Sequence, residues 1–246
     1  MRESMTYNPR FFQLRERQLE RMLEIVRSGR DAEGGGVVFL GDSLTELFPV
    51  DLHFPELAVR HNCGIAGSVS QELLWMADEA VIKRRPRLVV LMVGTNDLGN
   101  TVMASPRDVA CNVRDLVDLV LGNLPEARVL LWSPLPCVEE LDGYRAKPCG
   151  RSNDLLRMIL PQERELIRDG RVAFLDVFDA FLDERGGTRA ELYRDGLHLS
   201  DEGFALLAEL LRPEIHRLLG MEARSSHAAR PRPPRSGVVP APGPRL

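Results

Sequence analysis

The chain has 246 residues, of which 44% are hydrophobic and 28% charged, which is enough to bury one sizeable core. Its formal net charge of -4 lacks the excess of basic residues typical of nucleic-acid-binding proteins, so we expect no nucleic-acid partner. The longest apolar run, residues 88–93, is too short to cross a bilayer, and the first ten residues lack the apolar segment of a signal peptide. We expect a cytoplasmic protein without a membrane span.

The four cysteines predict neither a zinc site nor a disulfide framework, because none forms a Cys-x-x-Cys pair and each falls in a different predicted element: Cys63, Cys111, Cys137 and Cys149. Four of the histidines likewise lack partners at metal-ligand spacing: His53, His61, His216 and His227. We therefore expect no metal and no cofactor.

The first predicted element is an amphipathic helix over residues 9–27, in an N-terminal region of residues 1–33. Four apolar side chains recur at helical spacing, namely Leu19, Met22, Leu23 and Val26. This pattern predicts that they form a stripe packed on the domain. A glycine run at residues 34–36 follows the helix, but it precedes a strand and no Gly-Lys-Ser/Thr follows, which excludes a phosphate-binding loop.

Beyond residue 36, predicted strands and helices alternate. The strands are expected at residues 37–40, 58–62, 88–93, 128–132 and 172–175. The helices are expected at residues 70–83, around 113–120, at 153–167 and around 204–211. Residues 133–150 are rich in proline and glycine and predict a long irregular connection of the kind that often borders a cleft.

This alternation predicts an α/β fold, in which a parallel sheet of about five strands carries helices on both faces. Ligands of such sheets bind outside the carboxyl ends of the strands. We expect one domain over residues 34–220. Residues 221–246 are rich in proline and arginine and predict a disordered tail.

A serine, a histidine and an aspartate in this chain could perform nucleophilic catalysis. Ser43 directly follows the first predicted strand, and His198 lies just before the last predicted helix, for which Ser200 is a candidate N-cap. A serine hydroxyl needs a nearby base, and that base needs a group that orients it. His198 is the candidate base, and Asp195, three residues earlier, is the candidate orienting group.

Three groups at strand ends could bind the oxyanion of a tetrahedral intermediate: the backbone N–H of Ser43, the backbone N–H of Gly67, and the Asn96 carboxamide. Glycine allows close approach of the main chain, and a carboxamide donates hydrogen bonds without adding charge. Asp42 is expected to cap the turn that carries Ser43.

Four sequence blocks, which contain Ser43, Gly67, Asn96 and His198, resemble the GDSL or SGNH hydrolases in content and order. They are Gly41-Asp42-Ser43-Leu44, Asn62-Cys63-Gly64-Ile65-Ala66-Gly67, Gly94-Thr95-Asn96-Asp97 and Asp195-Gly196-Leu197-His198. Within this superfamily the resemblance is strongest to the catalytic α subunits of intracellular platelet-activating-factor acetylhydrolase, and bacterial GDSL esterases share the same features. The chain departs from those subunits at Ala66, Ser68 and Asp97, where Gly, Asp and Asn are expected.

The resemblance implies a three-layer α/β/α flavodoxin-like fold and metal-free hydrolysis of short-chain oxygen esters, acetyl esters above all, through an acyl-serine. It also implies a small-molecule ester substrate and suggests a homodimer. Two alternatives stay open. One is a non-catalytic binding or scaffold module on the same fold, and the other is an acyltransferase that uses an alcohol instead of water.

Overall fold

The computed structural model describes residues 14–99, 104–139 and 151–221. Five parallel strands form one sheet in the order β2-β1-β3-β4-β5. Their bounds are β1 Val37–Gly41, β2 Arg60–Gly64, β3 Leu88–Met92, β4 Arg128–Trp132 and β5 Val172–Leu175. The sheet is therefore of the predicted type, and its order reverses direction at β1, which lies between β2 and β3.

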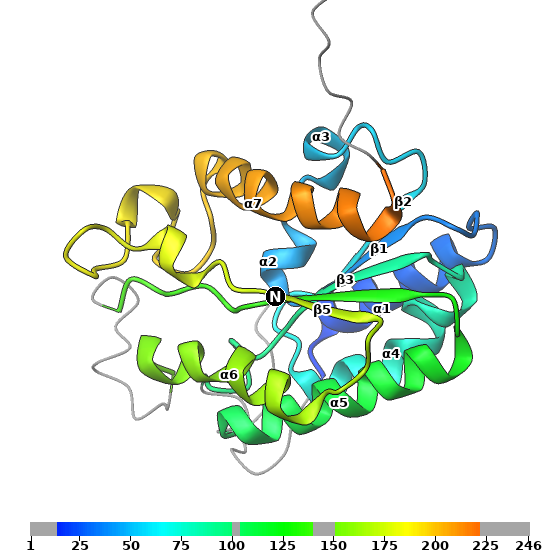
Figure 1. The fold of residues 1–246 in the computed structure, drawn as a ribbon, viewed down its shortest axis with the longest axis horizontal. Coiled ribbons are helices and arrows are strands. Elements are labelled where there is room, and N and C mark those ends of the chain that lie inside the picture. Colours follow the sequence, from blue (N-terminus) through cyan, green and yellow to red (C-terminus); the bar gives the residue numbers. More distant parts are fainter. Residues whose placement is uncertain (1–13, 100–103, 140–150, 222–246) are drawn as a thin grey trace, which may run out of the picture.

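Helices cover both faces of the sheet, so the molecule has three layers (Figure 1). One layer contains α1 Glu16–Gly29, α4 Ser70–Ala80, α5 Pro106–Asn123 and α6 Asn153–Leu166. The other contains α2 Ser43–Glu46, α3 Val50–His53 and α7 Asp201–Leu219. The expected N-cap of α7 is confirmed, because the Ser200 hydroxyl accepts a hydrogen bond from the Gly203 N–H at 3.2 Å. Short 3-10 turns occur at Ile82–Arg84, Phe178–Phe181 and Ala190–Leu192.

The central strands β1 and β3 are apolar on both faces because each face supports a separate core. In β1, Val38 and Leu40 pack in the core under α1, α4, α5 and α6. Val37 and Phe39 alternate with them and pack in the core under α2, α3 and α7. All four side chains are nearly inaccessible to solvent. This two-sided burial explains why the strands read as continuous hydrophobic runs.

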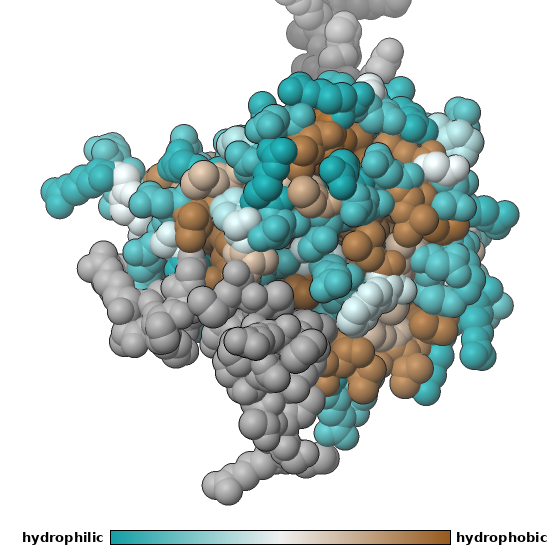
Figure 2. All heavy atoms as spheres, turned by 90° about the horizontal axis from the view of Figure 1, so that it is seen from below, coloured by the Kyte–Doolittle hydropathy of each residue, from teal (hydrophilic) through white to brown (hydrophobic). Residues whose placement is uncertain are grey.

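The N-terminal helix differs from its prediction in its start and in its orientation. The helix begins at Glu16, residues 14–15 are not helical, and residues 9–13 lie outside the described part of the chain. Gln18, Met22 and Ile25 form its buried face, whereas Leu19 and Leu23 are 46% and 51% exposed. The predicted stripe is therefore wrong at Leu19 and Leu23, whereas Met22 and Val26 pack against the core as predicted. Figure 2 views this layer from below and shows apolar side chains at the surface among hydrophilic ones.

Several other boundaries also differ from the predictions. β2 begins at Arg60 and continues to Gly64. A glycine is needed at its end, because a Cβ there would lie 2.1 Å from the Glu46 backbone nitrogen. The helix predicted over residues 70–83 ends at Ala80 and is followed by a 3-10 turn. Residues 133–138 are irregular, as expected, whereas residues 140–150 and 222–246 lie outside the described part.

Across residues 14–99, 104–139 and 151–221, no helix has both the length and the apolar composition required to cross a membrane.

Candidate active site

The candidate site lies at the carboxyl ends of β1, β2 and β3, where the strand order reverses. Ser43 follows β1, Gly67 follows β2 and Asn96 follows β3. The remaining candidate residues, Asp195 and His198, come from the loop before α7. The parallel sheet thus brings together segments that are far apart in the sequence, at the edge where such sheets bind ligands.

Ser43 is held by a tight turn between β1 and α2. Asp42 is the N-cap of α2, and its carboxylate accepts a hydrogen bond from the Leu44 N–H at 3.0 Å, which confirms the expected capping role. Gly41 is required because a Cβ there would lie 2.3 Å from the Met92 carbonyl oxygen. Ser43 is 8% exposed and lines the pocket described below.

Ser43, His198 and Asp195 form a continuous hydrogen-bonded chain. The His198 Nε2 lies 3.0 Å from the Ser43 Oγ. The His198 Nδ1 lies 2.7 Å from the Asp195 Oδ2. The other Asp195 oxygen accepts the backbone N–H groups of His198 and Leu197, at 2.7 and 3.0 Å. This geometry places Nδ1–H on the aspartate side and leaves the Nε2 lone pair for the serine proton.

The environment of Asp195 favours its charged form. Partial burial raises the pKa of Asp195, but the hydrogen bonds from the His198 ring and from the two backbone N–H groups outweigh burial, and the net pKa lies below its usual value. An ionised Asp195 can orient His198 and stabilise the imidazolium that forms when the imidazole accepts a proton.

Gly67 and Asn96 flank the serine from two neighbouring loops. Gly67 has a φ of +81°, a conformation that favours glycine. The Asn96 Nδ2 donates a hydrogen bond to the Ser68 carbonyl oxygen at 3.0 Å, which links the loop after β3 to the loop after β2. Both residues line the same pocket as Ser43 and His198.

This pocket has a volume of about 460 Å³, within the range of small-molecule sites. Besides the predicted residues, its walls contain side chains that the sequence did not reveal: Arg15, Arg17 and Gln18 from the N-terminal region, Leu47 after α2, and Arg151 before α6. Of its three arginines, Arg17 pairs with Glu46 at 3.3 Å and Arg151 is buried.

Two buried carboxyl groups lie behind the serine. Burial, with a smaller contribution from Asp97, raises the pKa of Asp42 to about 7, against the opposing effect of the Leu44 N–H hydrogen bond. Burial also raises the pKa of Asp97 to about 6, against the opposing effect of its hydrogen bonds with Ser70. Asp42 and Asp97 are 1% and 2% exposed.

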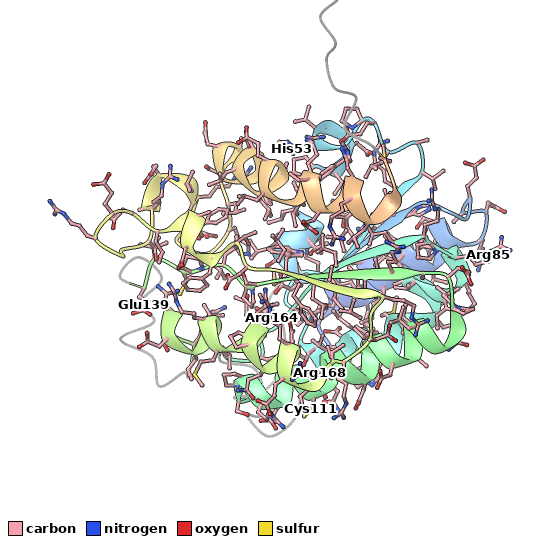
Figure 3. The ribbon with its side chains drawn as sticks, in the orientation of Figure 1. His53, Arg85, Cys111, Glu139, Arg164 and Arg168 are labelled. Carbon is pink, nitrogen blue, oxygen red and sulfur yellow. The ribbon has the colours of Figure 1, made fainter. Side chains whose placement is uncertain are left out.

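Other titratable side chains do not join the pocket. His53 lies on α3, beside α7 (Figure 3), and its ring packs 5.6 Å from that of Phe48. Cys63 and Cys137 are buried free thiols, Cys111 lies partly exposed on α5, and Cys149 falls outside the described residues.

The chain resembles known ester hydrolases in sequence and in structure. The model of the GDSL-like Lipase/Acylhydrolase family matches residues 39–206. Platelet-activating factor acetylhydrolase IB subunit alpha1 of Bos taurus is 32% identical over 203 residues, which cover 80% of this chain and 82% of that relative.

Among solved structures, a protein from Streptococcus pneumonia described as a platelet activating factor is 26% identical, with a TM-score of 0.74 and coverage of 81% of this chain and 93% of that one. An acylhydrolase from Bacteroides fragilis has a TM-score of 0.71 at 21% identity, covers 84% of this chain and 100% of that one, and shows the shared fold. The family match over most of the folded region and the identity to the bovine relative show that this chain belongs to the GDSL-like lipase/acylhydrolase family and is an ester hydrolase.

Proposed function

We propose that the protein is a serine esterase that removes short acyl groups, acetyl groups above all, from a small oxygen ester through an acyl-serine intermediate. The observation that carries this proposal is the hydrogen-bonded chain from the Ser43 Oγ through His198 to Asp195. Nucleophile, base and orienting group stand in contact without rearrangement.

In the first half of the reaction, the Ser43 Oγ attacks the ester carbonyl carbon while the His198 Nε2 accepts the hydroxyl proton. The negative charge on the former carbonyl oxygen is stabilised by the Ser43 N–H, the Gly67 N–H and the Asn96 carboxamide. His198 then returns the proton to the leaving alcohol oxygen as the carbon–oxygen bond breaks. The products are the free alcohol and an acyl group on Ser43.

In the second half, water attacks the acyl-serine while His198 accepts one of its protons. The second tetrahedral intermediate collapses, the Ser43 Oγ leaves, and His198 restores the serine proton. A carboxylic acid is released and the enzyme is regenerated.

A short acyl group is supported by the bovine relative, whose name describes it as an acetylhydrolase. The walls beside Ser43 agree with this, because Leu47 and Leu197 provide apolar contacts in a pocket of about 460 Å³ that acyl and alcohol groups must share.

A fluorophosphonate probe tests the proposal, because it labels a serine only where the hydroxyl is activated. We expect the full chain to be labelled at Ser43, Ser43→Ala to lose the label, and His198→Ala to react at least about 10²-fold more slowly. 4-Nitrophenyl esters of rising chain length then report acyl preference, with acetate expected to give the highest kcat/KM. A folded wild-type protein that takes no label would favour the scaffold alternative and contradict the proposal.

A further inference from the structure

The N-terminal helix α1 lies outside residues 39–206, which the family model matches, yet it contributes a wall of the pocket. The side chain that it buries there is an amide. Gln18 is 3% exposed, while two leucines of the same helix face solvent. Burial of an unpartnered amide is unfavourable, so this orientation requires good hydrogen-bond partners.

Gln18 has partners at both ends of its amide. Its Oε1 accepts the Arg15 backbone N–H at 3.0 Å, which directs Nε2 inward. The Nε2 donates to the Glu72 Oε2 at 3.2 Å. Glu72 is fully buried in the first turn of α4, immediately after the loop of residues 66–68. A polar contact thus joins α1 to the helix that follows this loop.

The same Gln18 Nε2 lies near Gly67 in the pocket wall. A Cβ built on Gly67 would point toward that nitrogen and lie 3.5 Å from it, so the amide occupies the space beside the glycine. Gln18 is therefore a neighbour of the residue whose N–H is assigned to the oxyanion.

Two further side chains of α1 hold the same region. Arg21 donates to the carbonyl oxygens of Asn62 and Gly64, at 2.9 and 3.0 Å, at the end of β2. Arg17 pairs at 3.3 Å with Glu46, whose other oxygen accepts the Ala66 N–H at 2.5 Å. Arg21 thus contacts the strand end that leads to the loop, and Arg17 reaches the first loop residue through Glu46. Gln18 contacts the helix that follows the loop.

We infer that α1 is a brace that positions the 66–68 loop for oxyanion binding, with Gln18 as its central positioning residue. The inference rests on the proposed function. A brace of this kind acts on the transition state, because the Gly67 N–H is needed where negative charge develops and matters little to the bound ester.

The test is steady-state kinetics of the full-length Gln18→Met variant, which keeps the length of the side chain and removes its hydrogen bonds. We expect kcat to fall about tenfold and KM to change less than about twofold. The fall in kcat is smaller than the roughly 10²- to 10³-fold that follows complete removal of one oxyanion donor, because the Gly67 N–H stays in place but is held less firmly. The rate of fluorophosphonate labelling should fall by a similar factor.

Variants at Glu72 examine the same contact from α4. Glu72→Gln keeps an acceptor for the Gln18 Nε2, so its kcat should stay within about twofold of the wild-type value. Glu72→Met removes the acceptor, so its kcat should fall by the same factor as that of Gln18→Met. The Gln18→Met/Glu72→Met double variant should lose no more than either single variant, as expected for one shared interaction. These variants test the contact even where Gln18→Met folds poorly.

Glu20→Ala is the matched control, because Glu20 is an exposed residue of the same helix outside the pocket, and its kcat should equal that of the wild type. Any of three results would overturn the brace. They are an unchanged kcat in folded Gln18→Met, an equal fall of kcat in Glu20→Ala, and a change in Gln18→Met that is confined to KM. A wild-type protein that neither takes the probe nor cleaves esters would instead refute the proposed function.

Discussion

At the scale of single residues, the unusual member of the candidate triad is its carboxylate. The Asp195 side chain is 55% exposed, yet it makes three hydrogen bonds with the segment that carries the catalytic imidazole. In the proposed mechanism, Asp195 fixes the tautomer and orientation of His198, with a Coulombic contribution that solvent weakens.

Asp195→Asn should lower kcat by about 10²- to 10³-fold, less than the roughly 10⁴-fold seen where such an aspartate is buried in a serine protease. The physical reason is that an amide can hold the imidazole in the wrong tautomer, while the exposed site loses less electrostatic support. Ester hydrolysis at saturating substrate measures the effect. Asp201→Asn is the control, because Asp201 is a neighbouring carboxylate that is 88% exposed and pairs with Arg194. Equal activities of Asp195→Asn and the wild type would contradict this role.

Asn96→Ala should lower kcat by about 10²- to 10³-fold with little change in KM, because its carboxamide is assigned to the oxyanion, which exists only along the reaction path. Parallel measurement of Tm shows whether loss of the 3.0 Å hydrogen bond to the Ser68 carbonyl also destabilises the fold. A variant in which KM rises and kcat is unchanged would indicate that Asn96 binds the ester in its ground state instead.

At the scale of secondary-structure elements, the strands and the site could be predicted because their signals are local. β3 and β4 are short apolar runs bounded by polar or turn residues, and Ser43, Gly67 and Asn96 follow strands at the edge where parallel sheets bind ligands. Hydrophobic runs thus predicted the loops that carry these three residues, whereas the order of the strands comes from the structure.

The orientation of α1 could not be predicted in the same way. Leu19 and Leu23 match a helical stripe as well as Met22 and Ile25 do, and the choice between the two faces depends on partners of Gln18 and Arg21 that lie more than 40 residues away. Arg151 was missed for a related reason, since it follows a proline- and glycine-containing stretch whose sequence has no helical or strand periodicity.

Asp97 connects two elements of the site, and its removal should loosen them. It directly follows Asn96, and its carboxylate accepts the Ser70 N–H at 3.0 Å and the Ser70 hydroxyl at 2.5 Å at the start of α4. Asp97→Ala leaves these buried donors without their acceptor, so we expect a loss of about 2 to 4 kcal/mol in the free energy of unfolding. Asp97→Asn keeps an acceptor, so its free energy of unfolding should fall by less. Urea denaturation with matched m-values measures both, and equal losses would contradict the hydrogen-bond account.

At the scale of the whole molecule, the fold buries carboxyl groups at a cost that depends on pH. Burial raises the pKa of Asp42 and Glu72 to about 7 and that of Glu163 to about 8. These groups keep their protons to higher pH in the folded chain than in the unfolded chain, so stability falls as pH rises from their unfolded pKa through their folded pKa. Burial lowers the pKa of His53 and His61, which opposes this trend only below about pH 6.5.

The window from pH 6.5 to 8.5 therefore isolates the carboxyl groups, and Tm of the wild type should decline across it. Glu163 provides the cleanest test, because it is 4% exposed on α6 and does not line the pocket. Glu163→Gln removes the ionisable proton at nearly constant shape. At pH 8.5 the free energy of unfolding of this variant should exceed that of the wild type by on the order of a few kcal/mol, and its Tm should be correspondingly higher. The advantage should shrink as pH falls and vanish below about pH 4.5, where the unfolded carboxyl is also protonated. Parallel Tm curves for the two proteins across the whole range would show that Glu163 does not carry this cost.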